Sequence, residues 1–205
     1  WVVIRSAWDV NLVFQSDEQL QGVVDRIHGR GLCVPCVAAP LFKSRLHGRG
    51  DYAQHLFNAE EADSLEDQLT MLRRAAHIAH LFNTNPVRCF SFWRLGDDPI
   101  SIWQDMLDMF APAVEVAAEE DVILVLENDF GCNLGSGEES ARFIEAVNSP
   151  HLRLLWDPGN SYFVNVTAYP DDYESCKHVI GHVHVKDGAA DPVTGEPRWV
   201  ELGPG

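Results

Sequence analysis

The chain has 205 residues, of which 46% are hydrophobic, and it carries 31 acidic against 15 basic side chains, a formal net charge of -16. This composition can supply a substantial core, and the negative charge argues against nucleic acid and anionic membrane surfaces as partners. The longest apolar runs have only the length of a strand, and no signal peptide pattern is recognised. We therefore expect a cytoplasmic protein with a single domain over residues 1–205.

Apolar segments that read as strands begin near residues 2, 32, 87, 122, 152 and 180. Segments with helical periodicity lie between them, and we place helices after Ser16, after Ser64, over about 101–119, after Ser136 and over about 171–178. Ser16 and Ser136 are followed three residues later by Gln19 and Glu139, the pattern of a capping box. Pro112 is expected to kink or divide the third helix. A long loop, about 44–63, is predicted between the second strand and the second helix, a length typical of a lid.

Strands that alternate with helices predict an α/β fold with a parallel sheet covered by helices. Two architectures compete, an open doubly wound sheet and a closed (β/α)8 TIM barrel. The open nucleotide-binding version predicts a glycine-rich turn after its first strand, and residues 7–16 contain no glycine. The barrel predicts functional residues at the carboxyl ends of several strands, as described below, and it is the fold that we favour.

A full barrel needs eight strand and helix units, whereas six units are recognised. The sequence begins inside a strand and finishes on Gly203-Pro204-Gly205, where another helix and strand are expected. We therefore predict an incomplete barrel, truncated at both ends, with about strands 2 to 7 present and the first and last strands missing. A barrel that lacks strands exposes the unpaired edges of its neighbouring strands, and such edges favour association into a homo-oligomer.

Three apolar segments end in residues that can bind metals. Side chains alternate along a strand, so His182, His184 and Lys186 share one face of the segment that begins at Ile180. Two earlier segments end in Glu127-Asn128 and in Asp157-Pro-Gly-Asn160. Either carboxylate alone could cap the following helix, and a buried histidine often only satisfies hydrogen bonds. Their recurrence at equivalent strand ends instead favours a divalent metal site with the ligands Glu127, Asp157 and His184, suited to manganese, magnesium, cobalt or zinc.

A metal at this place would suit proton transfer next to a carbonyl group, because it offsets the charge of the enediolate that forms. Glu127 is the candidate catalytic base as well as a metal ligand. His182 lies one layer deeper, and it is a candidate contact either to a metal ligand or to the substrate. The other candidate substrate contacts are Lys43, Trp93, Arg94, Asn160 and Lys186. Arg94 could instead pair with Asp97 or Asp98, and Trp93 could belong to the core.

The motifs Glu127-Asn128, Asp157-Pro-Gly-Asn160 and His182-Val-His184-Val-Lys186-Asp187, followed by Leu-Gly-Pro-Gly, resemble those of the xylose isomerase-like TIM barrel superfamily (sugar phosphate isomerase/epimerase family). This resemblance implies a metal held by Glu, Asp, His and Glu on the fifth to eighth strands. Glu127, Asp157 and His184 match the first three ligands, and the fourth would lie beyond Gly205. In the epimerases the first and last glutamates are also the acid/base pair, so the chain as given would lack half of it.

The resemblance and the residues together predict a divalent-metal-dependent isomerase or epimerase. Its substrate would be a small-molecule carbohydrate, namely a small sugar, a sugar phosphate or a hydroxy-keto acid. A lyase of the inosose dehydratase kind would use nearly the same site. A truncated barrel without catalysis is a third hypothesis. An endonuclease IV-like DNA-repair nuclease is disfavoured by the net charge of -16 and by the shortage of further histidines at strand ends.

Overall fold

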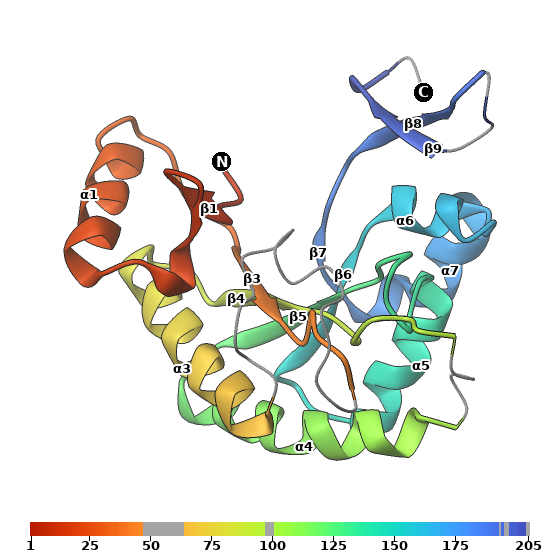
Figure 1. Cartoon of the computed structure of the whole chain (residues 1–205), viewed down its shortest axis with the longest axis horizontal. Coiled ribbons are helices and arrows are strands. Elements are labelled where there is room, and N and C mark those ends of the chain that lie inside the picture. The colour runs from red at the N-terminus through yellow and green to blue at the C-terminus, as the bar shows by residue number, and fades with distance from the viewer. Residues whose placement is uncertain (47–63, 97–100, 193, 195–196, 204–205) are drawn as a thin grey trace.

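A computed structural model describes residues 1–46, 64–96, 101–192, 194 and 197–203. Its centre is a parallel sheet of five strands that lie side by side in chain order (Figure 1). These strands are β3 (Val37–Leu41), β4 (Pro86–Cys89), β5 (Ile123–Glu127), β6 (Leu152–Trp156) and β7 (Ile180–Val183). Each pairs with the next in parallel, and Ile4 adds one parallel bridge to Val37. The predicted α/β fold with a parallel sheet is confirmed, and the strand expected near residue 2 is limited to this bridge.

Helices follow the strands along the chain, and α3, α4 and α5 lie together on one side of the sheet (Figure 1). The α-helices are α1 (Asp17–His28), α3 (Leu65–Leu81), α4 (Trp103–Glu119), α5 (Gly137–Val147), α6 (Pro158–Phe163) and α7 (Tyr173–Cys176). Leu12–Phe14 and Lys177–Val179 form 3-10 turns, and Ala168–Asp172 forms a π-helical turn. Two antiparallel pairs complete the fold, β1 (Ser6–Ala7) with β2 (Val10–Asn11) and β8 (Asp187–Ala190) with β9 (Pro197–Val200).

The predicted helix starts are found where capping residues stand in the sequence. Ser16, Ser64 and Ser136 each accept a hydrogen bond from the backbone N–H three residues on, and each forms a reciprocal capping box. Of the two outcomes predicted for Pro112, division is wrong, because α4 continues through this residue. The carbonyl that Pro112 leaves without a donor belongs to the exposed residue Asp108, where water can satisfy it.

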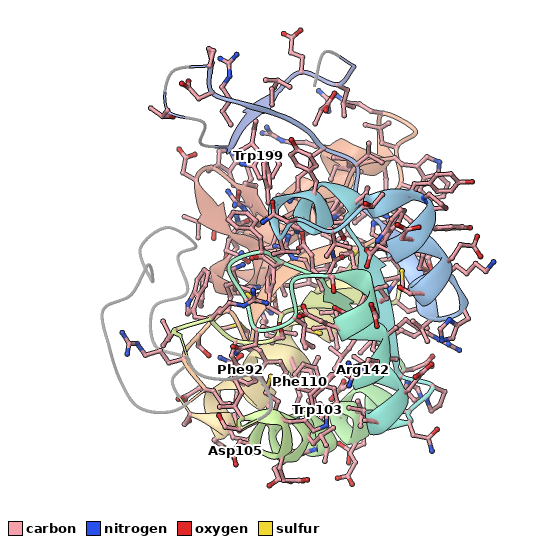
Figure 2. All side chains as sticks on the ribbon, turned by 90° about the vertical axis from the view of Figure 1, so that its right-hand side faces the viewer. Phe92, Trp103, Asp105, Phe110, Arg142 and Trp199 are labelled. Carbon is pink, nitrogen blue, oxygen red and sulfur yellow. The ribbon has the colours of Figure 1, made fainter. Side chains whose placement is uncertain are left out.

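The two faces of the sheet bury different side chains. On the face covered by helices, strand residues such as Leu124 and Leu154 join the main core. This core includes a cluster of phenylalanine rings around Phe110 (Figure 2). The ring centroid of Phe110 lies 4.8 Å from that of Phe42 and 5.0 Å from that of Phe143. On the other face Cys36, Val125 and Leu155 form a small separate cluster. Because side chains alternate, Glu127 and Asp157 lie two residues beyond Val125 and Leu155 on this second face.

The predicted lid falls mostly on residues 47–63, which lie outside the described part of the chain. Within the described ranges, no helix combines the length and the apolar character needed to cross a membrane. Three expectations stay predictions: the absence of the first and last barrel strands, the single domain over residues 1–205, and the homo-oligomer.

Candidate metal and substrate site

Glu127, Asp157 and His184 come together at the carboxyl ends of β5, β6 and β7. Each offers one ligand atom, and these atoms all lie within 4.8 Å of one another. Strand register explains the meeting, since Leu155 pairs with both Glu127 and His182, and the backbone N–H of His184 donates to the carbonyl of Trp156 at 3.0 Å. Asp157 and His184 therefore lie further along the strand direction than Glu127. The longer side chain of Glu127 reaches up to their ligand atoms.

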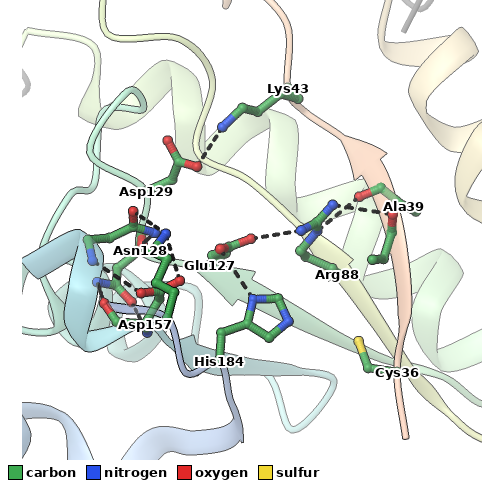
Figure 3. Close-up of polar contacts among 12 residues, drawn as sticks. Cys36, Ala39, Lys43, Arg88, Glu127, Asn128, Asp129, Asp157 and His184 are labelled. Carbon is green, nitrogen blue, oxygen red and sulfur yellow. Dashed lines mark hydrogen bonds and ion pairs between the residues drawn. The ribbon is translucent and has the colours of Figure 1, made fainter. Parts of the chain in front are cut away.

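Glu127 is 5% exposed and lies between two basic groups (Figure 3). Its Oε2 accepts a hydrogen bond from Nη1 of Arg88 at 3.1 Å, and its Oε1 lies 3.4 Å from Nδ1 of His184. Burial by itself would raise the pKa of Glu127, but the charges of Arg88, His184 and Lys186 outweigh it and lower this pKa to about 2. Glu127 is therefore a carboxylate at neutral pH.

Asp157 has two roles, because it both caps α6 and belongs to the ligand cluster. One carboxylate oxygen accepts the backbone N–H of Asn160 at 3.1 Å, and the other lies 2.8 Å from Nζ of Lys186. Burial raises the pKa of Asp157 despite this lysine. Pro158 occupies the first turn of α6, where its missing N–H costs nothing. A Cβ at Gly159 would lie 2.9 Å from Cγ of Lys186, so glycine lets the lysine cross the start of this helix.

A buried hydrogen-bond network holds Asp157 in place. The amide of Asn128 binds the backbone of Asp157 in both directions, accepting its N–H at 2.7 Å and donating to its carbonyl at 3.0 Å. Asn128 also donates to Ser161, whose hydroxyl donates to Asp172 at 2.7 Å. Asp172 accepts three more hydrogen bonds, from the indole of Trp156 and from the first two backbone N–H groups of α5. Loops after β5 and β6 are thus fixed to each other through side chains.

A pocket of about 750 Å³ opens beside this cluster. Of the residues predicted from the sequence, its lining includes Lys43, Trp93, Arg94, Glu127 and Lys186. Lys43 is buried, with its ammonium 2.7 Å from Asp129 and 4.0 Å from the ring centroid of Phe90. The ammonium of Lys186 lies 4.5 Å from the ring centroid of Trp199 and donates to Asn160 at 2.7 Å. The pocket therefore combines basic side chains with aromatic faces.

Two candidate substrate contacts lie elsewhere. Asn160 is fully buried, and its amide donates to the carbonyl of Asn128 at 2.7 Å and accepts from Lys186. His182 lies on β7 under His184, with the two ring centroids 5.6 Å apart, and it is not part of the pocket lining. Neither residue is part of the pocket lining, and both stay predicted substrate contacts. Arg94 donates to the carbonyl of Asn133 at 2.9 Å, while Asp97 and Asp98 lie outside the described residues.

Sequence reasoning missed three residues of the site. Arg88 follows Val87 on β4 and shares the inner face with Glu127, so strict alternation along that strand could have revealed it. Asp129 comes two residues after Glu127, directly at a strand end. Trp199 lies on β9 of the hairpin, and no periodic pattern in the sequence places it near Lys186.

The donor set fits a divalent ion. Two carboxylate oxygens and one imidazole nitrogen are ligands that magnesium, manganese and zinc accept in proteins. Arg88 and Lys186 balance the two carboxylates in the described structure, so a metal at Asp157 would compete with the ammonium of Lys186.

Parallel strands whose carboxyl ends gather carboxylate and imidazole side chains are typical of enzymes with a (β/α) barrel fold. A family model described as xylose isomerase-like TIM barrel matches residues 5–205. The chain belongs to this family, as its motifs predict. No curated protein matches the chain.

Solved structures of similar fold include two enzymes. The probable 3-DHS dehydratase AsbF of Bacillus anthracis is 17% identical, with a TM-score of 0.68 over 89% of this chain and 61% of its own. The 3-keto-D-glucoside 4-epimerase YcjR of E. coli is 15% identical, with a TM-score of 0.62 over 86% of this chain and 65% of its own.

A third similar structure contains a metal. It is a xylose isomerase-like TIM barrel protein from Mycobacterium smegmatis in complex with magnesium, 17% identical, with a TM-score of 0.65 over 93% of this chain and 63% of its own. This chain spans less than two thirds of the length of each of these three structures. At such identities the likeness shows the fold alone.

Proposed function

We propose that this chain belongs to a divalent-metal-dependent isomerase or epimerase that acts on a small polyhydroxylated carbonyl compound. The observation that carries the proposal is the cluster of Glu127, Asp157 and His184, whose ligand atoms lie within 4.8 Å of one another beside the pocket. These three residues would hold the ion. When bound, the ion would supply positive charge to offset the negative charge that develops on substrate oxygens during proton transfer.

The residues of the chain would divide the remaining work. Glu127 would accept the proton next to the carbonyl, since it is ionised and lines the pocket. Its low pKa makes it a weak base, so the ligand role is better supported than the base role. Lys186 would donate hydrogen bonds to a substrate oxygen, and the rings of Trp93 and Trp199 offer apolar faces to a sugar.

A lyase that removes water is the second candidate, and the position of Lys186 favours it. Loss of a hydroxyl next to an enediolate needs a proton donor, and the ammonium of Lys186 lies in the pocket lining, 2.8 Å from Asp157. The same proton abstraction by Glu127 would begin both reactions, so the two candidates differ only in the fate of the hydroxyl.

Proton exchange tests this proposal. We expect the purified chain with Mn²⁺ to catalyse exchange of the hydrogen next to the carbonyl of ketopentoses, ketohexoses or hydroxypyruvate in D₂O, measured by proton NMR. Exchange with retention of the hydroxyl groups would indicate an isomerase or epimerase, and loss of water a lyase. Glu127→Gln should abolish exchange, whereas Asp129→Asn, a change in the same pocket, should retain it. Equal exchange by the Glu127→Gln variant would refute the assigned role of Glu127.

A further inference from the structure

The pocket has a charge balance opposite to that of the whole chain. Acidic residues outnumber basic ones by 31 to 15 in the sequence, yet five basic residues and three acidic ones line the pocket in the described structure. The basic residues are Arg5, Lys43, Arg88, Arg94 and Lys186. A third of the basic residues of the chain are therefore gathered around one cavity.

Three of these five basic residues form close pairs with carboxylates of the site. Lys43 pairs with Asp129 at 2.7 Å, Arg88 with Glu127 at 3.1 Å, and Lys186 with Asp157 at 2.8 Å. These pairs hold the walls of the site and its ligands, and they contribute little net charge toward a substrate. Recognition of substrate charge therefore rests mainly on the other two residues, Arg94, whose ion pair with Glu139 is longer at 3.7 Å, and Arg5.

Arg94 has most of its hydrogen-bonding capacity unused. Its Nη2 donates to the carbonyl of Asn133 at 2.9 Å and lies 3.7 Å from Glu139. Glu139 is already engaged, since the same oxygen accepts the backbone N–H groups of Gly135 at 2.8 Å and Ser136 at 3.2 Å. The Arg94 side chain is 34% exposed. A guanidinium has five N–H donors in a planar fork, so Arg94 can offer a further pair of donors to the pocket.

Arg5 is the second basic residue of the pocket that keeps donors available for a substrate. It lines the pocket and follows Ile4, which bridges to β3 at one edge of the five-stranded sheet. Across the described ranges no ion pair or side-chain hydrogen bond occupies its exposed guanidinium. Both arginines line the same pocket and keep N–H donors available. The planar fork of a guanidinium matches carboxylate and phosphate oxygens.

We infer that the substrate carries an anionic group, a carboxylate or a phosphate, which Arg94 binds with support from Arg5. This inference rests on the proposed function, because it places the reacting carbons at Glu127 and the anionic group at another part of the pocket wall. The volume of about 750 Å³ leaves room for both parts of such a molecule. A bound divalent ion would add to the positive charge of the pocket, so it would not reverse the preference for an anionic substrate.

Binding of three compounds with the same carbon skeleton tests the inference. D-glycerate supplies the carboxylate, glycerol 3-phosphate the phosphate, and glycerol the neutral reference. The protein is treated with EDTA and then dialysed into metal-free buffer without EDTA, which would compete as a carboxylate. Titrations by isothermal calorimetry then report on the side chains alone. We expect one or both anions to bind at least about 10-fold more tightly than glycerol, as charge-assisted hydrogen bonds require. The tighter of the two anions identifies the chemistry of the group.

Matched arginine variants assign the effect to residues. Arg94→Met should weaken anion binding about 10-fold or more, and Arg5→Met should weaken it by a smaller factor. Arg142→Met, which alters an exposed arginine of α5 outside the pocket lining, should leave it unchanged (Figure 2). Arg5 is exposed, so its variant stays informative even if Arg94→Met disturbs folding. Equal binding of glycerol and the anions, or equal losses in Arg94→Met, Arg5→Met and Arg142→Met, would overturn the inference.

A parallel titration with Mn²⁺ separates this inference from the proposed function. If Mn²⁺ binds through Glu127 and the anions do not bind, only the charge of the substrate is wrong. If the anions bind through Arg94 and Mn²⁺ does not bind, the arginine site exists and the metal-dependent reaction fails.

Discussion

Replacing Glu127 with glutamine is expected to weaken Mn²⁺ binding by more than about 100-fold. The substitution removes one of three charged or imidazole donors whose atoms lie within 4.8 Å of one another. Residues that only support a metal ligand already account for about 10- to 100-fold in affinity, so a ligand itself should account for more. Calorimetry with Mn²⁺ at pH 7.5 measures the change.

Asp129→Asn is the matched control for this experiment. Asp129 lies two residues after Glu127, lines the same pocket and pairs with Lys43, but it is not one of the three clustered ligands. Its variant should therefore retain Mn²⁺ affinity. Circular dichroism must show that both variants are folded. If Glu127→Gln and Asp129→Asn bind Mn²⁺ equally well, Glu127 is not a metal ligand.

Replacing Arg88 with methionine is expected to lower the free energy of unfolding by about 3 kcal/mol at pH 7, because it leaves a buried carboxylate without its ionic partner. The guanidinium also donates toward the backbone carbonyls of Ala38 and Ala39 on β3, so its loss affects two neighbouring strands. Urea denaturation of the metal-free protein measures this effect. Arg153→Met, which alters an exposed arginine of β6, should change the stability far less.

The effect of Arg88→Met should depend on pH with a definite sign. In the folded protein the pKa of Glu127 is lowered to about 2 from an ordinary value of 4.5, so the unfolded chain binds the proton more readily. The resulting stability is fully present above pH 4.5 and is lost as the pH falls toward 2. The difference between wild type and Arg88→Met should therefore be largest near neutral pH and shrink below pH 4.5. A difference that does not change with pH would contradict this account of the Arg88–Glu127 pair.

Local rules account for the parts of the fold that were predicted correctly. Helix starts at Ser16, Ser64 and Ser136 follow from serine side chains that satisfy free backbone N–H groups. The meeting of Glu127, Asp157 and His184 follows from parallel strands, whose carboxyl ends share one edge of the sheet. Both depend on features within a few residues, or on a regular repeat, and are therefore visible in the sequence.

Features that depend on tertiary packing were not predictable in the same way. The six-residue helix α6 is too short to show periodicity, and Asp157 both caps it and points into the ligand cluster. The burial of Asn160 and its hydrogen bonds to Asn128 and Lys186 depend on tertiary packing, and its role as a substrate contact stays a prediction. The hairpin of β8 and β9 carries Trp199 to Lys186 through contacts between distant parts of the chain, including Phe163, whose ring centroid lies 4.5 Å from that of Trp199.

Crystals of the chain grown with Mn²⁺ and measured at the manganese absorption edge test the central claim most directly. We predict an anomalous difference peak within bonding distance of carboxylate oxygens of Glu127 and Asp157 and of a ring nitrogen of His184, with the ammonium of Lys186 displaced from Asp157. A manganese peak elsewhere, or an ammonium of Lys186 still bound to Asp157 with no peak beside Glu127, would contradict the claim that these strand ends form a metal site.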